Sequence, residues 1–159
     1  MARERFNKRF VVDLHDRSIE RAGDLGTFHL GDHGRLDILV NNAAIVDTED
    51  GPPTASALEA ARRIMNTNFV GTLAMTQAML PLLRQAPAAR IVNLSSSLGS
   101  LTLNGDPASP YYSARLIGYN ASKAALNMLT VQLAEELCDT PIVRQLGQSG
   151  LREDRPDRG

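Results

Sequence analysis

In the stretch LDILVNNAAI, residues 36–45, an apolar run of Ile38, Leu39 and Val40 is followed by two asparagines and two alanines. A continuous run of Leu, Ile and Val is typical of a parallel strand that is buried on both faces. The polar pair marks the carboxyl end of that strand, which is where open α/β sheets bind ligands. The stretch therefore predicts a buried parallel strand with a binding site at its end, where small residues let a ligand approach the backbone.

Further strands are predicted on both sides of this stretch. RFVVD (9–13) is a short β-branched run that ends in Asp, and RIVNLS (90–95) is a second mainly apolar run. Strands that alternate with helical segments are typical of an α/β fold with a parallel sheet. We therefore predict a partial doubly wound, Rossmann-like sheet in one domain that covers residues 1–143.

Two long helices are predicted around these strands. The first covers about residues 58–85, and Ser56 and Glu59 form the S-x-x-E pattern of a capping box at its start. Pro81 marks a kink or the end of this helix, because proline has no backbone N–H to donate. The second covers residues 119–138, where apolar positions occur all round, as in a buried helix.

The composition excludes several classes of protein. The chain has 159 residues, 43% hydrophobic content and a formal net charge of −1, which argues against nucleic acid or an anionic membrane as a partner. No apolar run reaches the roughly 18 residues of a spanning helix, and the N-terminus lacks the apolar segment of a signal peptide. Cys138 stands alone, so a reducing, cytoplasmic setting is expected. His15, His29 and His33 lack metal-ligand spacing, and we expect no metal site.

Tyr119 and Lys123 are the candidate catalytic pair. Residues four apart on a helix lie on the same face, so the two side chains should project together. A nearby ammonium group favours the phenolate form of tyrosine and lowers its pKa, which makes the pair a usable proton donor and acceptor near neutral pH. By spacing alone, an ordinary surface Tyr–Lys pair remains an alternative.

Four motifs in order place this pair in a wider pattern. They are NNAA (41–44), NTNFVG (66–71), NLSSSLG (93–99) and YNASK (119–123). This set resembles the short-chain dehydrogenase/reductase family, which has an Asn-Asn-Ala-Gly stretch, a helical Asn, a Ser at a strand end and a Tyr-x-x-x-Lys helix. The resemblance covers residues 9 to about 142 and is greatest to carbonyl-reductase-like members.

The resemblance implies a role for each catalytic residue. Tyr119 would be the general acid in carbonyl reduction and the base in alcohol oxidation. Lys123 would lower the pKa of Tyr119 and bind the nicotinamide ribose, and Ser96, three residues before Gly99, would orient the substrate carbonyl. Asn68 would hold a water in the proton relay, unless it is a plain surface residue of the helix.

The resemblance also implies an NAD(P) cofactor, with NADP favoured over NAD. Asn41, Asn42 and Ala43 would lie against this cofactor, together with Tyr119 and Lys123. Asp13 and Leu14 match the adenine-contacting Asp of the family and its neighbour, although a solvated Asp at a strand end is the alternative. Ala44 departs from the pattern, because the family usually has Gly there.

Other parts of the family pattern differ in this chain. The resemblance implies a glycine-rich turn that cradles the cofactor pyrophosphate on backbone N–H groups, but no G-x-x-x-G-x-G occurs before residue 36. We therefore expect a sheet that lacks the family's first two strands and its last strands. In that case the strand at 9–13 slides in beside the strand at 36–41. The loop from 97 to about 117 is longer than is usual in the family, and Tyr111 and Tyr112 either line the substrate mouth or pack the loop down.

The C-terminal segment 144–159 has almost no apolar pattern and is expected to be exposed and irregular. One coding sequence that it permits, read one base later, encodes a strand followed by Pro-Gly and Thr-Asp, which the family has after its active-site helix. We therefore hypothesise that this segment is frame-shifted.

Two functional hypotheses remain from the sequence. The first is an NAD(P)-dependent oxidoreductase that acts on a small-molecule carbonyl or secondary alcohol. The second is a catalytically inactive fragment or remnant that acts, if at all, through helix-mediated association. The resemblance also implies a homodimer formed through the helices at 58–85 and 119–138.

Overall fold

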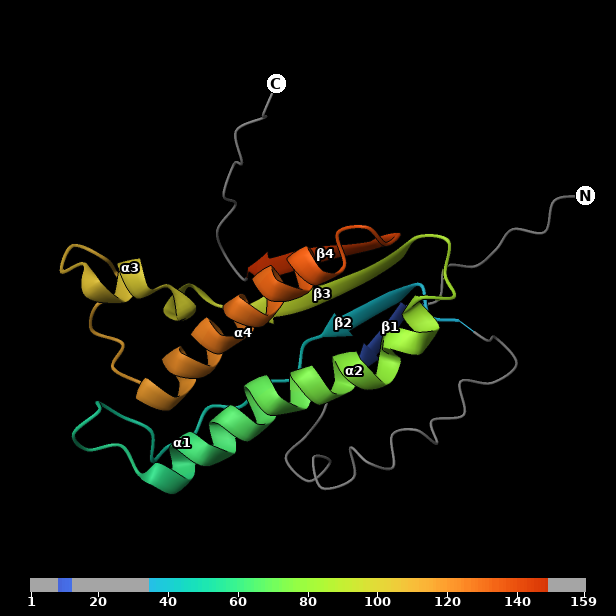
Figure 1. Cartoon of the computed structure of the whole chain (residues 1–159). Coiled ribbons are helices and arrows are strands. Elements are labelled where there is room, and N and C mark those ends of the chain that lie inside the picture. Colours follow the sequence, from blue (N-terminus) through green and yellow to red (C-terminus); the bar gives the residue numbers. More distant parts are fainter. Residues whose placement is uncertain (1–8, 13–34, 149–159) are drawn as a thin grey trace, which may run out of the picture.

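The computed structural model describes residues 9–12 and 35–148, which form one α/β unit (Figure 1). Four parallel strands follow one another across the sheet in chain order: β1 (Arg9–Val12), β2 (Ile38–Asn41), β3 (Ala89–Ser95) and β4 (Ile142–Gln148). The α/β class and the three predicted strands are confirmed. Asp13 and Leu14 lie outside the described residues, as does the segment 149–159.

The short strand β1 pairs directly with β2. Arg9 is opposite Ile38 and Val12 is opposite Asn41, in parallel register. This is the pairing expected if the first strand slides in beside the strand at 36–41. Its physical reason is that the N–H and C=O groups along an unpaired strand edge gain hydrogen bonds when another strand adds to it.

The prediction that the chain is irregular from residue 144 onward is wrong as far as residue 148. Strand β4 pairs with β3 over seven residues, from Ala89 opposite Ile142 to Ser95 opposite Gln148. The expectation that the sheet lacks every strand after the second long helix therefore needs correction, and so does the domain boundary at 143. A ladder of backbone hydrogen bonds needs no apolar side-chain pattern, so the composition of this segment did not reveal it. Ile142 is buried and anchors the start of the strand.

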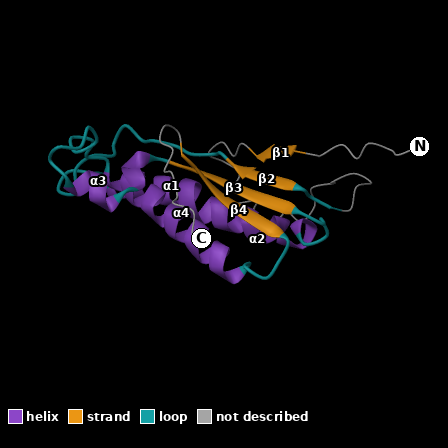
Figure 2. Ribbon diagram, turned by 90° about the horizontal axis from the view of Figure 1, so that it is seen from above, coloured by secondary structure: helices purple, strands orange, loops and turns teal. Residues whose placement is uncertain are grey.

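The described helices lie on one side of the sheet (Figure 2). Between β2 and β3 the chain forms α1 (Leu58–Met65), the π-helical turn η3 (Asn66–Gly71) and α2 (Thr72–Leu83) in direct succession. The long helix α4 (Ile117–Glu136) precedes β4. α2 ends two residues after Pro81, in agreement with the sequence. Within the predicted loop before α4, the structure adds the 3-10 turn η4 (Ser97–Gly99) and the short helix α3 (Leu101–Gly105).

The predicted capping box does not form at the start of α1. The N-cap residue is Ala57, which makes no side-chain cap bond. The Ser56 hydroxyl instead donates to the Asp50 carboxylate, and Glu59 pairs with Arg62 on the surface of the helix. The hydroxyl that the pattern assigned to the helix end thus bonds to a carboxylate six residues earlier in the same loop.

The hydrophobic core lies between the helices and one face of the sheet. Leu39 of β2 and Ile91 of β3 point into it, whereas Val40 and Val92 on the opposite face are only half-buried. Within the described residues, helices cover a single face, so burial on both faces is not observed for β2. The core residues are Leu36, Leu39, Met75, Met79, Leu83, Ala86, Ala89, Ile91, Leu126, Leu129, Leu133, Leu137 and Ile142. No helix in the described part of the chain has the length and apolar character needed to cross a membrane.

Candidate functional site

Tyr119 and Lys123 lie together on α4, one turn apart, at the carboxyl end of β3. The Lys123 Nζ atom donates a hydrogen bond of 2.9 Å to the Leu94 carbonyl oxygen and lies 5.6 Å from the centroid of the Tyr119 ring. Only 3% of Lys123 is exposed to solvent. An ordinary surface Tyr–Lys pair does not fit this geometry, because the lysine is almost fully buried.

Burial also changes the protonation chemistry of Lys123. Removal of the ammonium group from water lowers the pKa of Lys123 below its ordinary value, because the charged form loses hydration. Lysines whose pKa is lowered by burial are typical of functional sites, where the amine takes part in the chemistry. The Lys123 side chain is thus buried beside a half-buried phenol.

The turn η4 holds Ser96 against the same face of α4. Ser96 is the N-cap residue of η4, and its Oγ accepts a hydrogen bond from the Leu98 N–H at 3.2 Å, while within the described part of the chain its hydroxyl hydrogen stays available to donate. Ser95 is buried and its hydroxyl donates to the Asn127 side chain. Ser97 is also buried. Among these three serines, only Ser96 is half-buried.

Gly99 allows η4 to approach α4 this closely. A Cβ atom at this position would lie 2.8 Å from the backbone carbon of Lys123 and 2.9 Å from its Cβ and carbonyl oxygen. The Gly99 carbonyl also accepts a hydrogen bond from Asn127 Nδ2 at 3.3 Å. The strand end that carries Ser96 is therefore packed on the turn of α4 that carries Lys123.

Asn68 is fully buried in the π-helical turn η3 and joins two segments to its own helix. Its Oδ1 accepts from the Ile45 N–H at 2.8 Å, and its Nδ2 donates to the Ile45 carbonyl and to Ser122 Oγ, both at 3.0 Å. The Ser122 hydroxyl in turn donates to the Tyr119 carbonyl oxygen at 2.7 Å. Asn68 has no exposed surface, so the alternative of a plain surface asparagine is excluded. π-helical turns occur frequently at functional sites.

The side chain of Asn41 points into the fold. Its Nδ2 donates to Asn93 Oδ1 at 2.8 Å and to Thr76 Oγ1 at 3.2 Å, and Asn93 Nδ2 donates to Thr130 Oγ1 at 2.9 Å. All four side chains are buried, so one polar chain links α2, β2, β3 and α4. Asn42 next to it is exposed.

Other predicted cofactor residues are less constrained by contacts. Ala43 is half-buried at the carboxyl end of β2, close in sequence to Asn41. Asp13 and Leu14 lie outside the described residues. Contact with a cofactor stays a prediction for all of these positions.

Sequence reasoning missed several residues that hold this site. Ser122 and Asn127 are three and eight residues after Tyr119, so helical spacing could have indicated them. Asn93 was visible as a polar residue inside an apolar strand. Asp50, which contacts the start of α4, had no local signal because its partners are 68 and 69 residues away.

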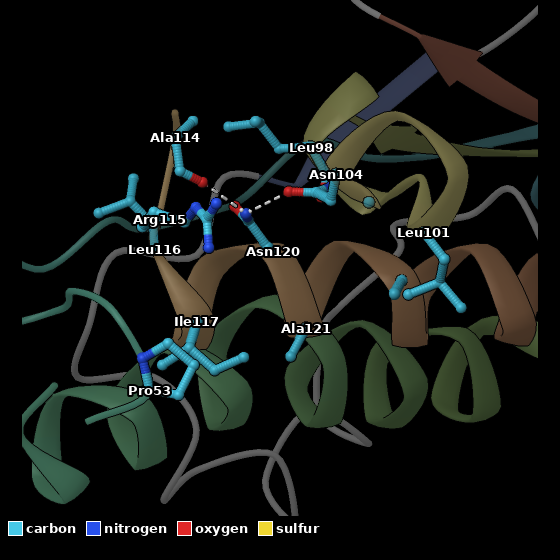
Figure 3. A pocket seen from close by; sticks show the side chains of 12 residues that line it. Pro53, Leu98, Leu101, Asn104, Ala114, Arg115, Leu116, Ile117, Asn120 and Ala121 are labelled. Atoms are coloured by element: carbon cyan, nitrogen blue, oxygen red, sulfur yellow. Dashed lines mark hydrogen bonds between the residues drawn. The ribbon is translucent and has the colours of Figure 1, made fainter. Parts of the chain in front are cut away.

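A separate pocket of about 260 Å³ lies beside another face of α4 (Figure 3). Asn120 Nδ2 donates there to Asn104 Oδ1 and to the Ala114 carbonyl, both at 2.8 Å. Apolar side chains form most of its wall, among them Pro53, Leu98, Leu101, Leu116 and Ile117. Tyr119, Lys123 and Ser96 do not line it, and neither do the two other tyrosines of the preceding loop. The loop at 97–117 is thus bonded to α4 through Asn104 and the Ala114 carbonyl, which both accept from Asn120.

The described residues form a parallel α/β sheet with Tyr119 and Lys123 at the carboxyl end of β3. Residues 10–145 match the family model described as short chain dehydrogenase. The chain therefore belongs to the short-chain dehydrogenase family.

Individual relatives agree with this assignment. A short-chain dehydrogenase of Penicillium roqueforti, anuI, is 39% identical over 146 residues, which cover 89% of this chain and 56% of that protein. Carbonyl reductase [NADPH] 1 of Sus scrofa is 40% identical over 100 residues, which cover 63% of this chain and 32% of that protein. A metagenomic short-chain oxidoreductase solved in complex with NADP is 28% identical, with a TM-score of 0.67, and the match covers 86% of this chain and 57% of that one. The chain thus spans about a third to just over half the length of these proteins.

Proposed function

We propose that this protein is an NAD(P)-dependent oxidoreductase that reduces a carbonyl group or oxidises a secondary alcohol. The observation that carries the proposal is the buried Lys123 ammonium beside the Tyr119 ring, at the carboxyl end of β3. Two relatives support it, because one is named a carbonyl reductase that uses NADPH and another was solved with NADP.

In this proposal Tyr119 carries the proton. Its phenol donates a proton to the carbonyl oxygen during reduction and takes it back during oxidation. The Lys123 charge stabilises the phenolate that remains. Ser96 donates its free hydroxyl hydrogen to the same substrate oxygen and so orients the carbonyl. Asn68 would hold a water in the proton relay, beside the Ser122 hydroxyl that it already contacts.

The donors at this end of the sheet fit the ribose side of a nicotinamide cofactor. Lys123 supplies an ammonium group, and Asn42 lies exposed at the carboxyl end of β2, next to the small residue Ala43. When bound, NAD(P)H supplies the hydride. Asn41 supports this edge from inside through its bonds to β3 and α2. We propose NADP over NAD by similarity to the named relatives.

A matched pair of tyrosine variants tests the proposal. Tyr119→Phe should lower carbonyl reduction by roughly a hundredfold or more, which is the typical contribution of a positioned acid, and should leave NADPH binding largely intact. Lys123→Ala should weaken both. Tyr112→Phe is the control, because Tyr112 also has a cation over its ring, Arg115 at 4.6 Å, but is not the tyrosine to which the proton transfer is assigned.

The measurements are NADPH and NADH titration by fluorescence, and NADPH oxidation with a panel of ketones and aldehydes. If Tyr119→Phe keeps more than a few per cent of the wild-type rate, the assignment of the proton donor is wrong. A chain that is folded but neither binds nor oxidises NADPH would favour the alternative function instead.

That alternative is association without catalysis, and we propose it as the second candidate. The surface of α4 carries exposed apolar side chains, with Met128 57% and Val131 64% exposed, and Leu58 is exposed at the start of α1. Such side chains favour a homodimer formed through α1, α2 and α4, which an active enzyme could also form. Light scattering of the wild type and of Val131→Glu would test it: a dimer that the variant does not weaken excludes this face.

A further inference from the structure

Asp50 stands at the start of the helix that carries Tyr119. It lies in the loop between β2 and α1 and is half-buried. Asp50 Oδ1 accepts a hydrogen bond from the Gly118 N–H at 2.9 Å, and Oδ2 accepts one from the Tyr119 N–H at 2.9 Å. One carboxylate thus holds two successive N–H groups of the first turn of α4.

These bonds complete the hydrogen bonding of the helix end. The N-cap residue Leu116 has no side-chain acceptor, so α4 cannot cap itself. The Ile117 N–H donates to the Gly51 carbonyl at 3.0 Å, and the Asn120 N–H donates to the Leu116 carbonyl at 2.8 Å. The loop around Asp50 therefore supplies acceptors for the three N–H groups that have no partner inside the helix. The negative carboxylate also suits the partial positive charge of a helix N-terminus.

The carboxylate is itself held in place on the loop side. Asp50 Oδ1 also accepts from the Gly51 N–H at 3.0 Å and from Ser56 Oγ at 2.9 Å. Gly118 leaves room for it, because a Cβ at that position would lie 3.2 Å from Asp50 Oδ1 and 3.1 Å from the Ala61 Cα of α1. The geometry therefore depends on a fixed carboxylate and on a glycine beside it.

We infer that Asp50 is a positioning residue for Tyr119. First turns of helices open most readily, and Tyr119 is only the third residue of α4. Because Asp50 accepts the hydrogen bond of the Tyr119 N–H, it keeps this turn helical and the phenol ring beside Lys123. This inference rests on the proposed role of Tyr119, but it concerns the position of the ring and not the chemistry.

The test uses the full chain and does not depend on turnover. Amide hydrogen exchange of Gly118 and Tyr119 reports the first turn, and exchange of Leu126 and Leu129 reports the middle of α4. The NMR shift of the Lys123 ε-methylene protons reports the ring, because the Tyr119 ring current displaces these protons when Nζ lies 5.6 Å from the ring centroid.

Asp50→Ala should accelerate exchange at Gly118 and Tyr119 by about fivefold to thirtyfold, as expected for loss of a helix cap. Exchange at the middle of the helix should change little, and the Lys123 ε protons should move toward their shift in an unfolded chain. Asp50→Asn keeps one acceptor oxygen in a side chain of the same shape, so it should restore part of both effects.

Asp47→Ala is the matched control. Asp47 is a carboxylate of the same loop whose bonds go to Arg63 and to the Glu49 N–H, not to α4. Asp47→Ala should leave unchanged both the amide exchange of Gly118 and Tyr119 and the NMR shift of the Lys123 ε protons. The inference is overturned if Asp50→Ala leaves the first turn protected, if it accelerates exchange equally along the helix, or if the Lys123 signal stays in place while the turn opens. None of these outcomes depends on whether the protein reduces a carbonyl, and loss of activity in Tyr119→Phe does not alter them.

Discussion

Replacement of Gly99 by alanine would place a methyl group where η4 meets α4. The new Cβ would lie 2.8 Å from the Lys123 backbone carbon and 2.9 Å from the Lys123 Cβ and carbonyl oxygen. These neighbours belong to a helix backbone and to the first carbon of a buried side chain, so none of them can rotate out of the way. The turn and the helix must therefore separate by roughly half an ångström to reach ordinary van der Waals distance.

Overpacking of this kind typically costs about 1–3 kcal/mol of folding free energy. For a chain of this length, each kcal/mol lowers the melting temperature by about 2–4 °C. Gly99→Ala should therefore melt roughly 2–12 °C below the wild type. The separation should also weaken the hydrogen bond between Asn127 Nδ2 and the Gly99 carbonyl, which is already 3.3 Å long.

Thermal and urea unfolding followed by circular dichroism would measure this change. Gly105→Ala is the matched control, because a Cβ at Gly105 would meet nothing within 4 Å. That variant should keep the wild-type stability or gain up to about 1 kcal/mol through the unfolded state. Equal stability of Gly99→Ala and the wild type would refute the reasoning, and so would equal destabilisation by the two alanines.

Two further predictions concern buried polar groups. Burial lowers the pKa of Lys123 below its ordinary value of 10.5, so the unfolded chain binds this proton more tightly than the folded one. The free energy of unfolding of the wild type should therefore rise relative to that of Lys123→Met as the pH increases toward about 10.5, and Lys123→Met should be at least as stable as the wild type at neutral pH. Urea unfolding of both proteins at neutral pH and near pH 10 checks this, and a constant difference would contradict it. Asn93→Leu should lower stability by about 1–3 kcal/mol, because Asn41 and Thr130 each lose a buried partner. Urea unfolding measures this as well, and a change below about 0.5 kcal/mol would show that the polar chain adds nothing to stability.

The strands and the Tyr119–Lys123 pair could be predicted because their signals are local. A run of apolar β-branched residues specifies a buried strand without reference to the rest of the chain. Helical geometry alone brings residues four apart onto one face. Ser96 was selected among three adjacent serines by a local signal as well, because it lies three residues before Gly99.

Predictions failed where a group formed a hydrogen bond that the local pattern did not indicate. Ser56 fits a capping box, but its hydroxyl bonds to Asp50 in the folded protein. The segment after residue 143 has no strand pattern, yet its backbone completes a ladder with β3. In the first case a carboxylate six residues earlier in the same loop accepts from the hydroxyl, and in the second the neighbouring strand supplies the backbone partners.

The sequence by itself determined the strands β1, β2 and β3 and the two long helices, and it placed Tyr119 and Lys123 one turn apart on the second helix. The tertiary structure decided how these residues are held: Lys123 buried under the Leu94 carbonyl, Asn68 bonded to Ile45 and Ser122, and Asp50 bonded to the start of α4. The physical reason is the range of the interactions. Side-chain periodicity acts within a few residues, whereas a buried donor or acceptor must find its partner wherever the packed chain places one.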